Sequence, residues 1–263
     1  MSRAKKIWLI AASALTVSGI LLMVGALAAV GFDYKKLSTV SYLTVTEEIS
    51  EEFDSVSIDV ATADIEVIPS DGKDCRVVLY ERKSDRFSAS VEDKTLVIRR
   101  NGDKKWYEEI HIDFDSPKIT AYLPKDKYDD FRIKCTTGDI LIDSMEIGGD
   151  INITSTTGNV RLNETKVSGD IDISTTTGDI SLIDSAADKD ISVSCTTGDV
   201  KFDGADADAI KAHTTTGDIS GTLLTDKSFS AHTTTGDISV PDTEGGSCEL
   251  STTTGDIRIK ISD

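Results

Sequence analysis

Apolar and polar residues alternate along most of the chain after residue 53, and in the second half the alternation recurs in copies of one short unit. Each copy contains Thr-Thr-Gly-Asp-Ile or a close variant, beginning at residues 136–140. The glycines of these copies are separated by 20, 20, 20, 19, 19 and 19 residues, and they are Gly138, Gly158, Gly178, Gly198, Gly217, Gly236 and Gly255. A fixed period of this size is typical of stacked repeats.

Within each copy the apolar residues follow a period of two on both sides of the glycine. Around Gly178, Ile171 and Ile173 precede the glycine and Ile180 follows it, with polar residues between. This period predicts two short, half-buried strands per copy. One such unit cannot bury its apolar face alone, so the copies must stack. We therefore predict an all-β fold in which residues 131–263 form a right-handed parallel β-solenoid of about seven regular coils of 19–20 residues.

The Gly-Asp pair marks one turn of each coil, and a second turn near residues 148–150 makes the predicted coil two-sided. Glycine adopts positive φ without steric cost, and a following aspartate accepts hydrogen bonds from nearby backbone amides. This structural role is our main interpretation of both residue types.

Stacking also places the aspartates that follow the glycines in one column. They are Asp139, Asp179, Asp199, Asp218, Asp237 and Asp256, with Asn159 at the same position of its copy. Stacked carboxylates repel one another, so hydrogen bonds of the turn or bound cations must offset the repulsion. Because calcium prefers oxygen ligands, these aspartates are calcium candidates, although the Gly-Gly-x-Gly-x-Asp calcium-roll motif is absent. We expect no other metal, no cofactor and no catalytic residue.

Residues 53–130 contain strand-like segments with less regular spacing, at 55–60, 64–68, 76–80, 86–91, 96–99, 109–114 and 118–123. Residues 62–65 (Thr-Ala-Asp-Ile) resemble a degenerate copy of the repeat. Terminal repeats are usually atypical and cap the stack, so we predict irregular N-terminal coils that form a cap. At the other end, the charges of Arg258, Lys260 and Asp263 are expected to keep other chains from pairing with the last strand.

The N-terminal segment has a different character. Residues 7–31 carry no charge and follow Arg3, Lys5 and Lys6. A run of this length can span a bilayer as a helix, and basic flanking residues stay on the cytoplasmic side.

We therefore predict a cytoplasmic segment 1–6, a single transmembrane signal anchor 7–31 and a stalk 32–52, with the C-terminal domain extracellular. The alternative is a cleaved signal peptide, because residues 26–28 (Ala-Leu-Ala) resemble a cleavage site.

The composition excludes some partners and sites. The chain has 28 Lys and Arg residues against 46 Asp and Glu residues, a net charge of −18, which disfavours nucleic acid because its binding depends on a basic surface. No CxxC pair is present, and Cys135 and Cys195 lie three predicted coils apart, too far for a disulfide. We expect the cysteines to be small buried residues.

Three repeated features allow other functional interpretations. His213 and His232 occupy the same position in consecutive copies and are expected to be outward neighbours, which suits a metal site or pH sensing as well as a solvated pair. The Thr-Thr-Thr runs resemble the flat threonine arrays of ice-binding solenoids, although Cys135 and Cys195 interrupt them. Clustered carboxylates also occur in glycan-cleaving β-helices, but acids that recur in every copy indicate architecture rather than one active site.

Several of these motifs together resemble a known family. The repeated Thr-Thr-Gly-Asp-Ile, residues 119–124 (Ile-Thr-Ala-Tyr-Leu-Pro), residues 128–133 (Tyr-Asp-Asp-Phe-Arg-Ile) and the N-terminal apolar segment look like the bacterial putative-adhesin family of β-strand-repeat proteins. This family is a domain of unknown function that includes LiaG-like envelope proteins. The resemblance covers residues 53–263. It implies a right-handed β-solenoid at the bacterial surface, often associated with membrane partners and envelope stress, and it carries no catalytic residues.

The sequence thus predicts a non-enzymatic, membrane-anchored extracellular β-solenoid that acts as a binding or scaffold module at the cell envelope. Its partners would be the membrane, through the N-terminal helix, and an envelope protein or wall polymer. Trp106 and Tyr107 are candidate anchors of an interface. The alternative function is an enzyme that acts on surface glycans.

Overall fold

The computed structural model describes residues 3–33, 38, 40–72, 74–101, 115–125 and 128–262. The chain divides into two compact units, Met1–Ser41 with Lys104–Asp115 and Tyr42–Asp103 with Ser116–Asp263. Trp106, Tyr107 and the predicted strand 109–114 lie outside the described residues.

The first unit contains the helix α1 (Arg3–Ala29). Its segment Trp8–Ala29 has 22 residues and a mean hydropathy of 2.1. At 1.5 Å per residue this segment is about 33 Å long, which is enough to cross the hydrocarbon core of a bilayer. A signal sequence near the N-terminus meets the same criteria.

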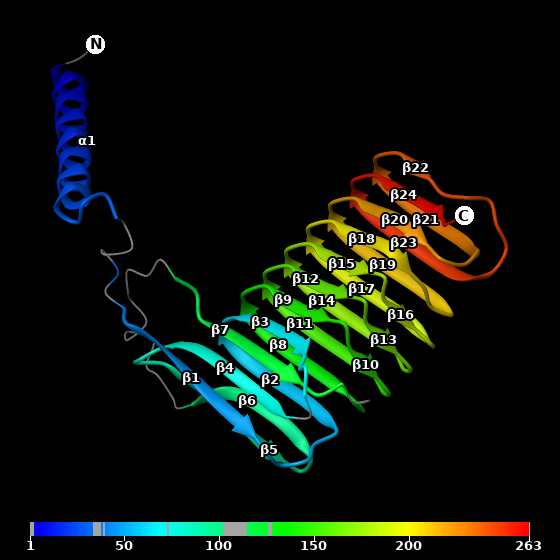
Figure 1. The fold of residues 1–263 in the computed structure, drawn as a ribbon. Coiled ribbons are helices and arrows are strands. Elements are labelled where there is room, and N and C mark those ends of the chain that lie inside the picture. The colour runs from blue at the N-terminus through cyan, green and yellow to red at the C-terminus, as the bar shows by residue number, and fades with distance from the viewer. Residues whose placement is uncertain are drawn as a thin grey trace. The chain divides into compact units, whose positions relative to one another are not determined.

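The second unit is built from β-strands alone among its described residues (Figure 1). Its first part contains β1 (Tyr42–Ile49), β2 (Ser55–Thr62), β3 (Asp64–Pro69), β4 (Cys75–Arg82), β5 (Arg86–Glu92), β6 (Thr95–Asn101) and β7 (Lys118–Leu123). The regular coils follow with β8 (Phe131–Thr137), β9 (Ile140–Asp143), β10 (Glu146–Ile147), β11 (Ile151–Thr157), β12 (Val160–Asn163), β13 (Lys166–Val167), β14 (Ile171–Thr177), β15 (Ile180–Ile183), β16 (Ala186–Ala187), β17 (Asp190–Thr197), β18 (Val200–Ala205), β19 (Ala209–Thr216), β20 (Ile219–Leu223), β21 (Lys227–Thr235), β22 (Ile238–Ser239), β23 (Gly246–Thr254) and β24 (Ile257–Ile261).

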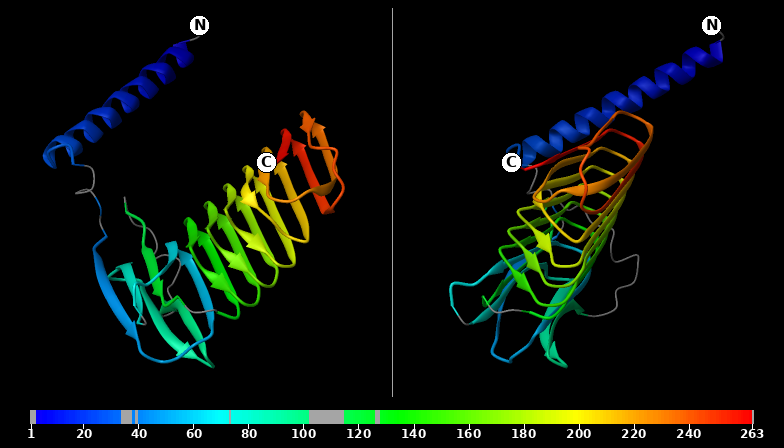
Figure 2. Two further views of the ribbon diagram at one scale, coloured as in Figure 1. Left: turned by 45° about the vertical axis from the view of Figure 1, so that its right-hand side comes forward. Right: turned by 90° about the vertical axis from the view of Figure 1, so that its right-hand side faces the viewer.

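These strands form two long sheets and one short sheet, and the coils stack on one another in the views of Figure 2. Sheet A has the order β1-β4-β7-β3-β9-β12-β15-β18-β20-β24-β22, and sheet B has the order β21-β23-β19-β17-β14-β11-β8-β2-β6-β5. In every regular coil the strand before the glycine belongs to sheet B and the strand after it to sheet A. The predicted all-β solenoid with parallel, stacked coils is therefore confirmed.

Like residues stack on like residues in the core. Ile151 and Ile153 pair in register with Ile171 and Ile173 on the next coil, and all four are buried. The same columns continue through most of the stack as one hydrophobic cluster. Each side chain in a column is therefore shielded from water by the coils on both sides of it. Burying one such side chain stabilises the folded protein by about 1.5–3 kcal/mol.

The cross-section differs from the prediction in one respect. A third sheet, sheet C, contains the two-residue strands β10, β13 and β16, so the first regular coils have three sides rather than two. The additional corner lies at Ser144, Glu164 and Asp184, which adopt φ values of 54°, 46° and 45°. The two-sided coil was wrong because the left-handed conformation at this corner is adopted by residues other than glycine, which leave no glycine signal in the sequence.

The N-terminal end is capped by antiparallel strands. β1 pairs with β4, β4 pairs with β7, and β5 pairs with β6, all antiparallel. The predicted stalk 32–52 is therefore too long, since residues 42–49 form β1 inside sheet A. Ala63 takes the place of the glycine in the first coil, and Asp64 accepts a hydrogen bond from the N–H of Asp139 at 3.0 Å.

At both ends of the stack a coil is inserted out of chain order. The β2–β3 coil, first in the chain, lies between β6–β7 and β8–β9. The β23–β24 coil, last in the chain, lies between β19–β20 and β21–β22. The edge strands at the C-terminal end are consequently β21 and β22, so the charges of Arg258 and Lys260 on β24 do not protect that edge. The prediction was wrong because the repeat fixes the shape of a coil but not its place in the stack; Asp263 lies outside the described residues.

A buried lysine fastens the crossover to β21. The Lys227 Nζ atom donates hydrogen bonds to Asp206 Oδ1 (3.0 Å), the Ala207 carbonyl (2.6 Å) and Thr225 Oγ1 (2.7 Å). Burial alone would raise the pKa of Asp206, but hydrogen bonds from Thr225 and Lys227 and the lysine charge hold it below its ordinary value. The ammonium group is thus satisfied only while Asp206 is ionised and in place.

The first prediction concerns the turn glycines. A β-carbon at Gly178 would overlap the carbonyl of Gly158, and φ is +136°. We expect Gly178→Ala to destabilise the protein by about 3 kcal/mol or more, because strain and a backbone clash combine. Urea unfolding of the full chain in detergent measures this. Gly72→Ala is the control, since the nearest atom to its added carbon is 3.9 Å away; equal stability of the two variants would contradict the role of the turn.

The second prediction concerns Lys227. Asp206→Asn leaves a buried ammonium without a counter-charge and should cost about 2–3 kcal/mol, whereas Lys227→Met removes the charge itself and should cost less. Because the pKa of Asp206 is lowered on folding, its contribution is complete above the ordinary carboxyl pKa of about 4 and is lost as pH falls below it. Unfolding of both variants at pH 7 and pH 3 checks this. A greater loss in Lys227→Met than in Asp206→Asn would refute the interpretation.

Candidate functional site

A ladder of hydrogen bonds runs along the Gly-Asp turns. In each coil the backbone N–H of the residue after the glycine donates to the side-chain oxygen of its counterpart in the neighbouring coil. In spatial order the ladder joins Asp64, Asp139, Asn159, Asp179, Asp199, Asp218, Asp256 and Asp237, with N···O distances of 2.6–3.0 Å. The N–H of Asp237, together with Arg258, holds the pKa of Asp256 below its ordinary value. The aspartates therefore have a structural partner that offsets part of their mutual repulsion.

A second aspartate ladder lies at the opposite turn. The N–H groups of Asp150, Asp170 and Asp190 donate to Oδ1 of Asp130, Asp150 and Asp170, at 2.9–3.0 Å. Burial and then the charges of Asp170 and Asp150 raise the pKa of the nearby Asp172. This ladder was not predicted from the sequence, although Asp150, Asp170 and Asp190 recur with the same spacing of 20 residues.

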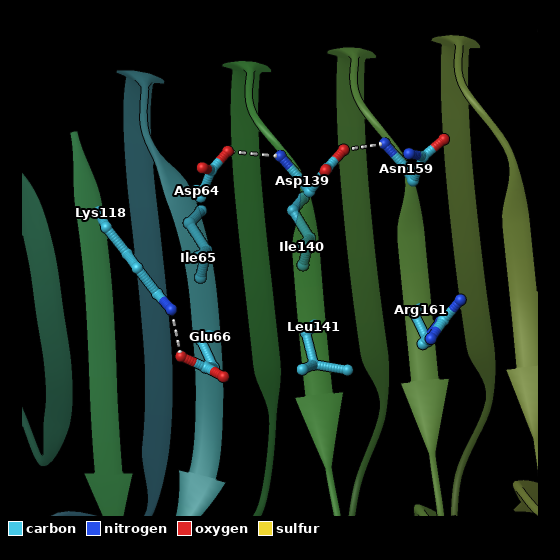
Figure 3. A pocket seen from close by; sticks show the side chains of 9 residues that line it. All are labelled: Asp64, Ile65, Glu66, Lys118, Asp139, Ile140, Leu141, Asn159 and Arg161. Atoms are coloured by element: carbon cyan, nitrogen blue, oxygen red, sulfur yellow. Dashed lines mark hydrogen bonds and ion pairs between the residues drawn. The ribbon is translucent and has the colours of Figure 1, made fainter. Parts of the chain in front are cut away.

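The first ladder forms the rim of a shallow groove on the outer face of sheet A (Figure 3). The groove has a volume of about 320 Å³ and crosses β7, β3, β9 and β12. Its lining residues are Asp64, Ile65, Glu66, Lys118, Asp139, Ile140, Leu141, Asn159 and Arg161. The volume lies at the lower end of the range for ligand pockets.

Of the two basic residues in the groove, Lys118 forms an ion pair and Arg161 does not. Lys118 Nζ forms an ion pair with Glu66 at 2.7 Å on one side, and Figure 3 shows this pair across β7 and β3. On the other side lies Arg161, which has no ion-pair or hydrogen-bond partner among the residues that the structure describes. The half-buried side chain of Leu141 lies between them. An arginine can bind a carboxylate or phosphate with two hydrogen bonds, and the leucine offers an apolar contact beside it.

This combination occurs at one place along the sheet. The outward column that contains it pairs Glu66, Leu141, Arg161, Ser181, Lys201, Ser220, Arg258 and Ser239 in register. Leu141 is the single apolar residue among these eight. Lys201 and Arg258 differ from Arg161 because each has an acidic partner nearby, Asp203 and Asp256 respectively. The groove is therefore a singular feature on a repetitive face, which is what a specific binding site requires.

Comparison with known proteins places this fold in a family. Residues 53–263 match the Toastrack DUF4097 family. The chain belongs to this family. The match confirms the resemblance to a family of putative adhesins of unknown function. No curated protein matches the chain significantly.

Among solved structures, the Toastrack domain is similar to a putative adhesin from Bacteroides fragilis NCTC 9343, with 19% identity, a TM-score of 0.56, and coverage of 84% of this chain and 97% of that chain. A putative lipid binding protein from Parabacteroides distasonis ATCC 8503 has 17% identity, a TM-score of 0.48, and coverage of 82% and 97%. At 19% identity the first likeness is evidence for a shared fold alone.

The predicted histidine pair is separated in the Toastrack domain. β19 and β21 both pair with the inserted β23, so Ser251 stands between His213 and His232. His213 Nδ1 lies 2.9 Å from Ser251 Oγ. The two imidazoles are therefore two strand spacings apart, roughly 9–10 Å, and the prediction that they are neighbours was wrong.

The cysteines of the Toastrack domain are free and buried. The Cys195 thiol donates to the carbonyl of Gly178 at 3.2 Å, as Thr214 donates to Gly198 at 3.0 Å. Burial raises the pKa of the Cys248 thiol to about 12, against the opposing charge of Lys227, and that of Cys75 to about 11. Cys135, Thr233 and Thr252 donate to the turn of a neighbouring coil in the same way, so cysteine and threonine can replace one another at this position as small buried donors.

The threonines next to the turns are exposed in two complete columns on sheet B. The outward-facing pairs are Thr136-Thr137, Thr156-Thr157, Thr176-Thr177, Thr196-Thr197, Thr215-Thr216, Thr234-Thr235 and Thr253-Thr254. The cysteines interrupt only the inward column. The threonine array is thus more regular than the sequence analysis stated, and a regular array alone identifies no ligand.

The calcium candidates remain a prediction. No group of three or more His, Cys, Asp or Glu side chains placed to hold a metal occurs within the described ranges of the Toastrack domain. Each candidate aspartate except Asp237 uses one carboxylate oxygen to accept the N–H of the next coil. A calcium ion would have to be bound by the remaining oxygens or displace these bonds.

The third prediction separates the two roles of the column. Asp199→Asn keeps an acceptor oxygen, as Asn159 does naturally for the N–H of Asp179 at 2.9 Å, and should change the free energy of unfolding by less than about 0.5 kcal/mol. Asp199→Ala removes the acceptor and should cost about 1 kcal/mol. Thermal unfolding with calcium or with chelator completes the test: calcium that raises the melting temperature of the parent but not of Asp199→Asn would establish a metal site instead.

Proposed function

We propose that this chain is a membrane-anchored binding module of the bacterial cell envelope, with the Toastrack domain on the extracellular side. The N-terminal apolar helix supports the anchor, and the family match supports a role in binding. The observation that carries the proposal is Arg161, an arginine without a described partner, beside the half-buried Leu141 in the groove on sheet A.

The ligand chemistry follows from the groove. A carboxylate or phosphate would pair with Arg161, and an adjacent apolar or sugar face would cover Leu141. The rim of aspartates repels ligands with many negative charges, so we propose a segment with one acidic group, supplied by an envelope protein. Wall polymer bridged by calcium is the other outcome of the test. A link to envelope stress follows from the family resemblance alone and would depend on the identity of the captured protein.

Catalysis is the less favoured function. Asp64 and Asp139 on the rim are turn acceptors of the ladder. The acids therefore orient the backbone of the next coil, whereas a glycosidase needs one acid and one base directed at a substrate. Hydrolysis of surface glycans by the purified chain would overturn this assignment.

The fourth prediction tests the groove. The full chain is immobilised from detergent and incubated with envelope membranes and with wall polymer, with and without calcium. Arg161→Ser should weaken capture of the bound partner by about 10-fold, as expected for loss of a charge-assisted hydrogen bond.

Lys201→Ser is the matched control. It removes the same charge from the same column, two coils away, and introduces the residue found at Ser181 between them. Equal capture by both variants would place the binding site elsewhere. Capture of polymer that requires calcium and ignores both substitutions would point to the aspartate column.

A further inference from the structure

The C-terminal end of sheet B is an open edge. β21 (Lys227–Thr235) pairs with β23 on one side and has no neighbour on the other among the described strands. In the inner coils the N–H of each turn glycine donates to a threonine carbonyl of the next coil, as Gly255 does to Thr235 at 2.9 Å. Gly236, in the terminal coil, has no further coil to receive its N–H. Phe131 and Ile151, which stand in the same column as Phe229, donate their N–H groups to the next coil at 2.9 and 2.8 Å. Backbone direction alternates along a strand, so the N–H and C=O groups of Phe229, Ala231 and Thr233 also point to the free edge.

The hydrophobic core is open at the same end. Phe229 and Ala231 are only partly buried, whereas their partners on β23, Cys248 and Leu250, are buried. On sheet A, Ile238 of β22 is 46% exposed, whereas Ile257 on the adjacent strand is 0% exposed. The end coil therefore presents unpaired backbone and apolar side chains together.

Nothing on β21 itself discourages pairing. Its one charged residue, Lys227, is buried and bound to Asp206. The loop before β23 contacts only its start, through Thr243 to the Lys227 carbonyl and Ser228 to Gly245. The opposite end of the stack differs, because the edge strands there carry exposed charges, such as Glu47 and Glu48 on β1. Natural proteins protect free edges with such charges, and their absence from β21 suits an edge that is paired in the working state.

We propose that two copies of this chain associate through their β21 strands, antiparallel across a two-fold axis, to form a dimer joined at the C-terminal ends. The strand is self-complementary in this arrangement. With Ala231 opposite Ala231 of the second copy, Phe229 faces Thr233 on the core side and Ser230 faces His232 on the outer side. Phe229 and Thr233 then form a hydrogen-bonded pair, because their backbone groups point to the free edge, and Ser230 and His232 form a non-hydrogen-bonded pair.

A second copy fits this edge better than an unrelated strand for two reasons. Two chains that each carry a net charge of −18 approach with least repulsion where the surface is uncharged, and the exposed residues of β21 are serine, threonine and histidine. A two-fold axis also closes the assembly, because it uses both free edges at once. Joining the C-terminal edge to the N-terminal cap of another copy would instead bring it against β1 or β5, whose charges oppose pairing. The dimer does not depend on the groove of sheet A.

The fifth prediction is a cross-linking experiment on the full chain in detergent. Ser230→Cys/His232→Cys places thiols opposite one another in the proposed dimer, at the roughly 4.5 Å Cα separation of a non-hydrogen-bonded pair, which is within the range of disulfides. We expect a disulfide-linked dimer under mild oxidation. Ser192→Cys/Ser194→Cys is the control, since these residues occupy the same outward positions on the interior strand β17 and should give no dimer. The native cysteines are buried and give little background.

Sedimentation of the uncrosslinked chain provides the second readout. Ala231→Pro removes an N–H that points to the free edge, a place where edge strands tolerate proline, and should raise the dimer dissociation constant at least about 10-fold. Ser230→Glu/His232→Glu places like charges opposite one another and should act in the same direction without a backbone change. An absence of 230/232 cross-links, a series of higher oligomers, or a dimer that survives both variants would each overturn the proposal, the last by assigning association to the N-terminal helix or another surface.

Discussion

The close approach of neighbouring coils at the Gly-Asp turn is the constraint on which the rest of the structure depends. At each turn the carbonyl of one glycine occupies the space that a β-carbon of the next would need, and φ of the glycines is 136–149°. Only glycine permits both features. The aspartate beside it then receives the next N–H, so the turn sets both the spacing and the direction of stacking. Identical turns impose one register on both long sheets.

One register has consequences for the core and for the ends. Because each column repeats its residue type, adding a coil extends the core without changing its packing, and stability accumulates coil by coil. The terminal coils lack one neighbour, so the ends are where stacking is weakest. Insertion of the β23–β24 coil places the last strand, β24, inside the stack and leaves the outermost β21–β22 coil connected to the chain on both sides. Lys227 reinforces one of these connections by binding across the crossover.

The sequence determined the repeated part of the fold and left the singular parts open. The period of two around each glycine predicted the strands, their sheet and their burial, because every copy restates the same local information. The order of coils depends instead on loops such as 240–245, whose path no periodicity encodes. The same holds for the candidate site. The aspartate column was predicted because it repeats, whereas the groove depends on Lys118, Leu141 and Arg161, which come from separate strands and share no motif. The pairing of β1 with β4 was missed for the same reason.

The distinction between repeated and singular residues also decides which residues can indicate a function. A residue that recurs in every coil must first satisfy the turn or the core, so its recurrence cannot distinguish a ligand site from architecture. Function should therefore be sought where the repeat is broken and the break leaves a group unsatisfied. Arg161 in the groove is one such break, since its charge lacks the acidic neighbour that Lys201 and Arg258 have. The edge of β21 is another, since the terminal coil retains the backbone groups of the ladder without a coil to receive them. One break is on a face and the other at an end, so a partner in the groove and a second copy at the edge could be bound together.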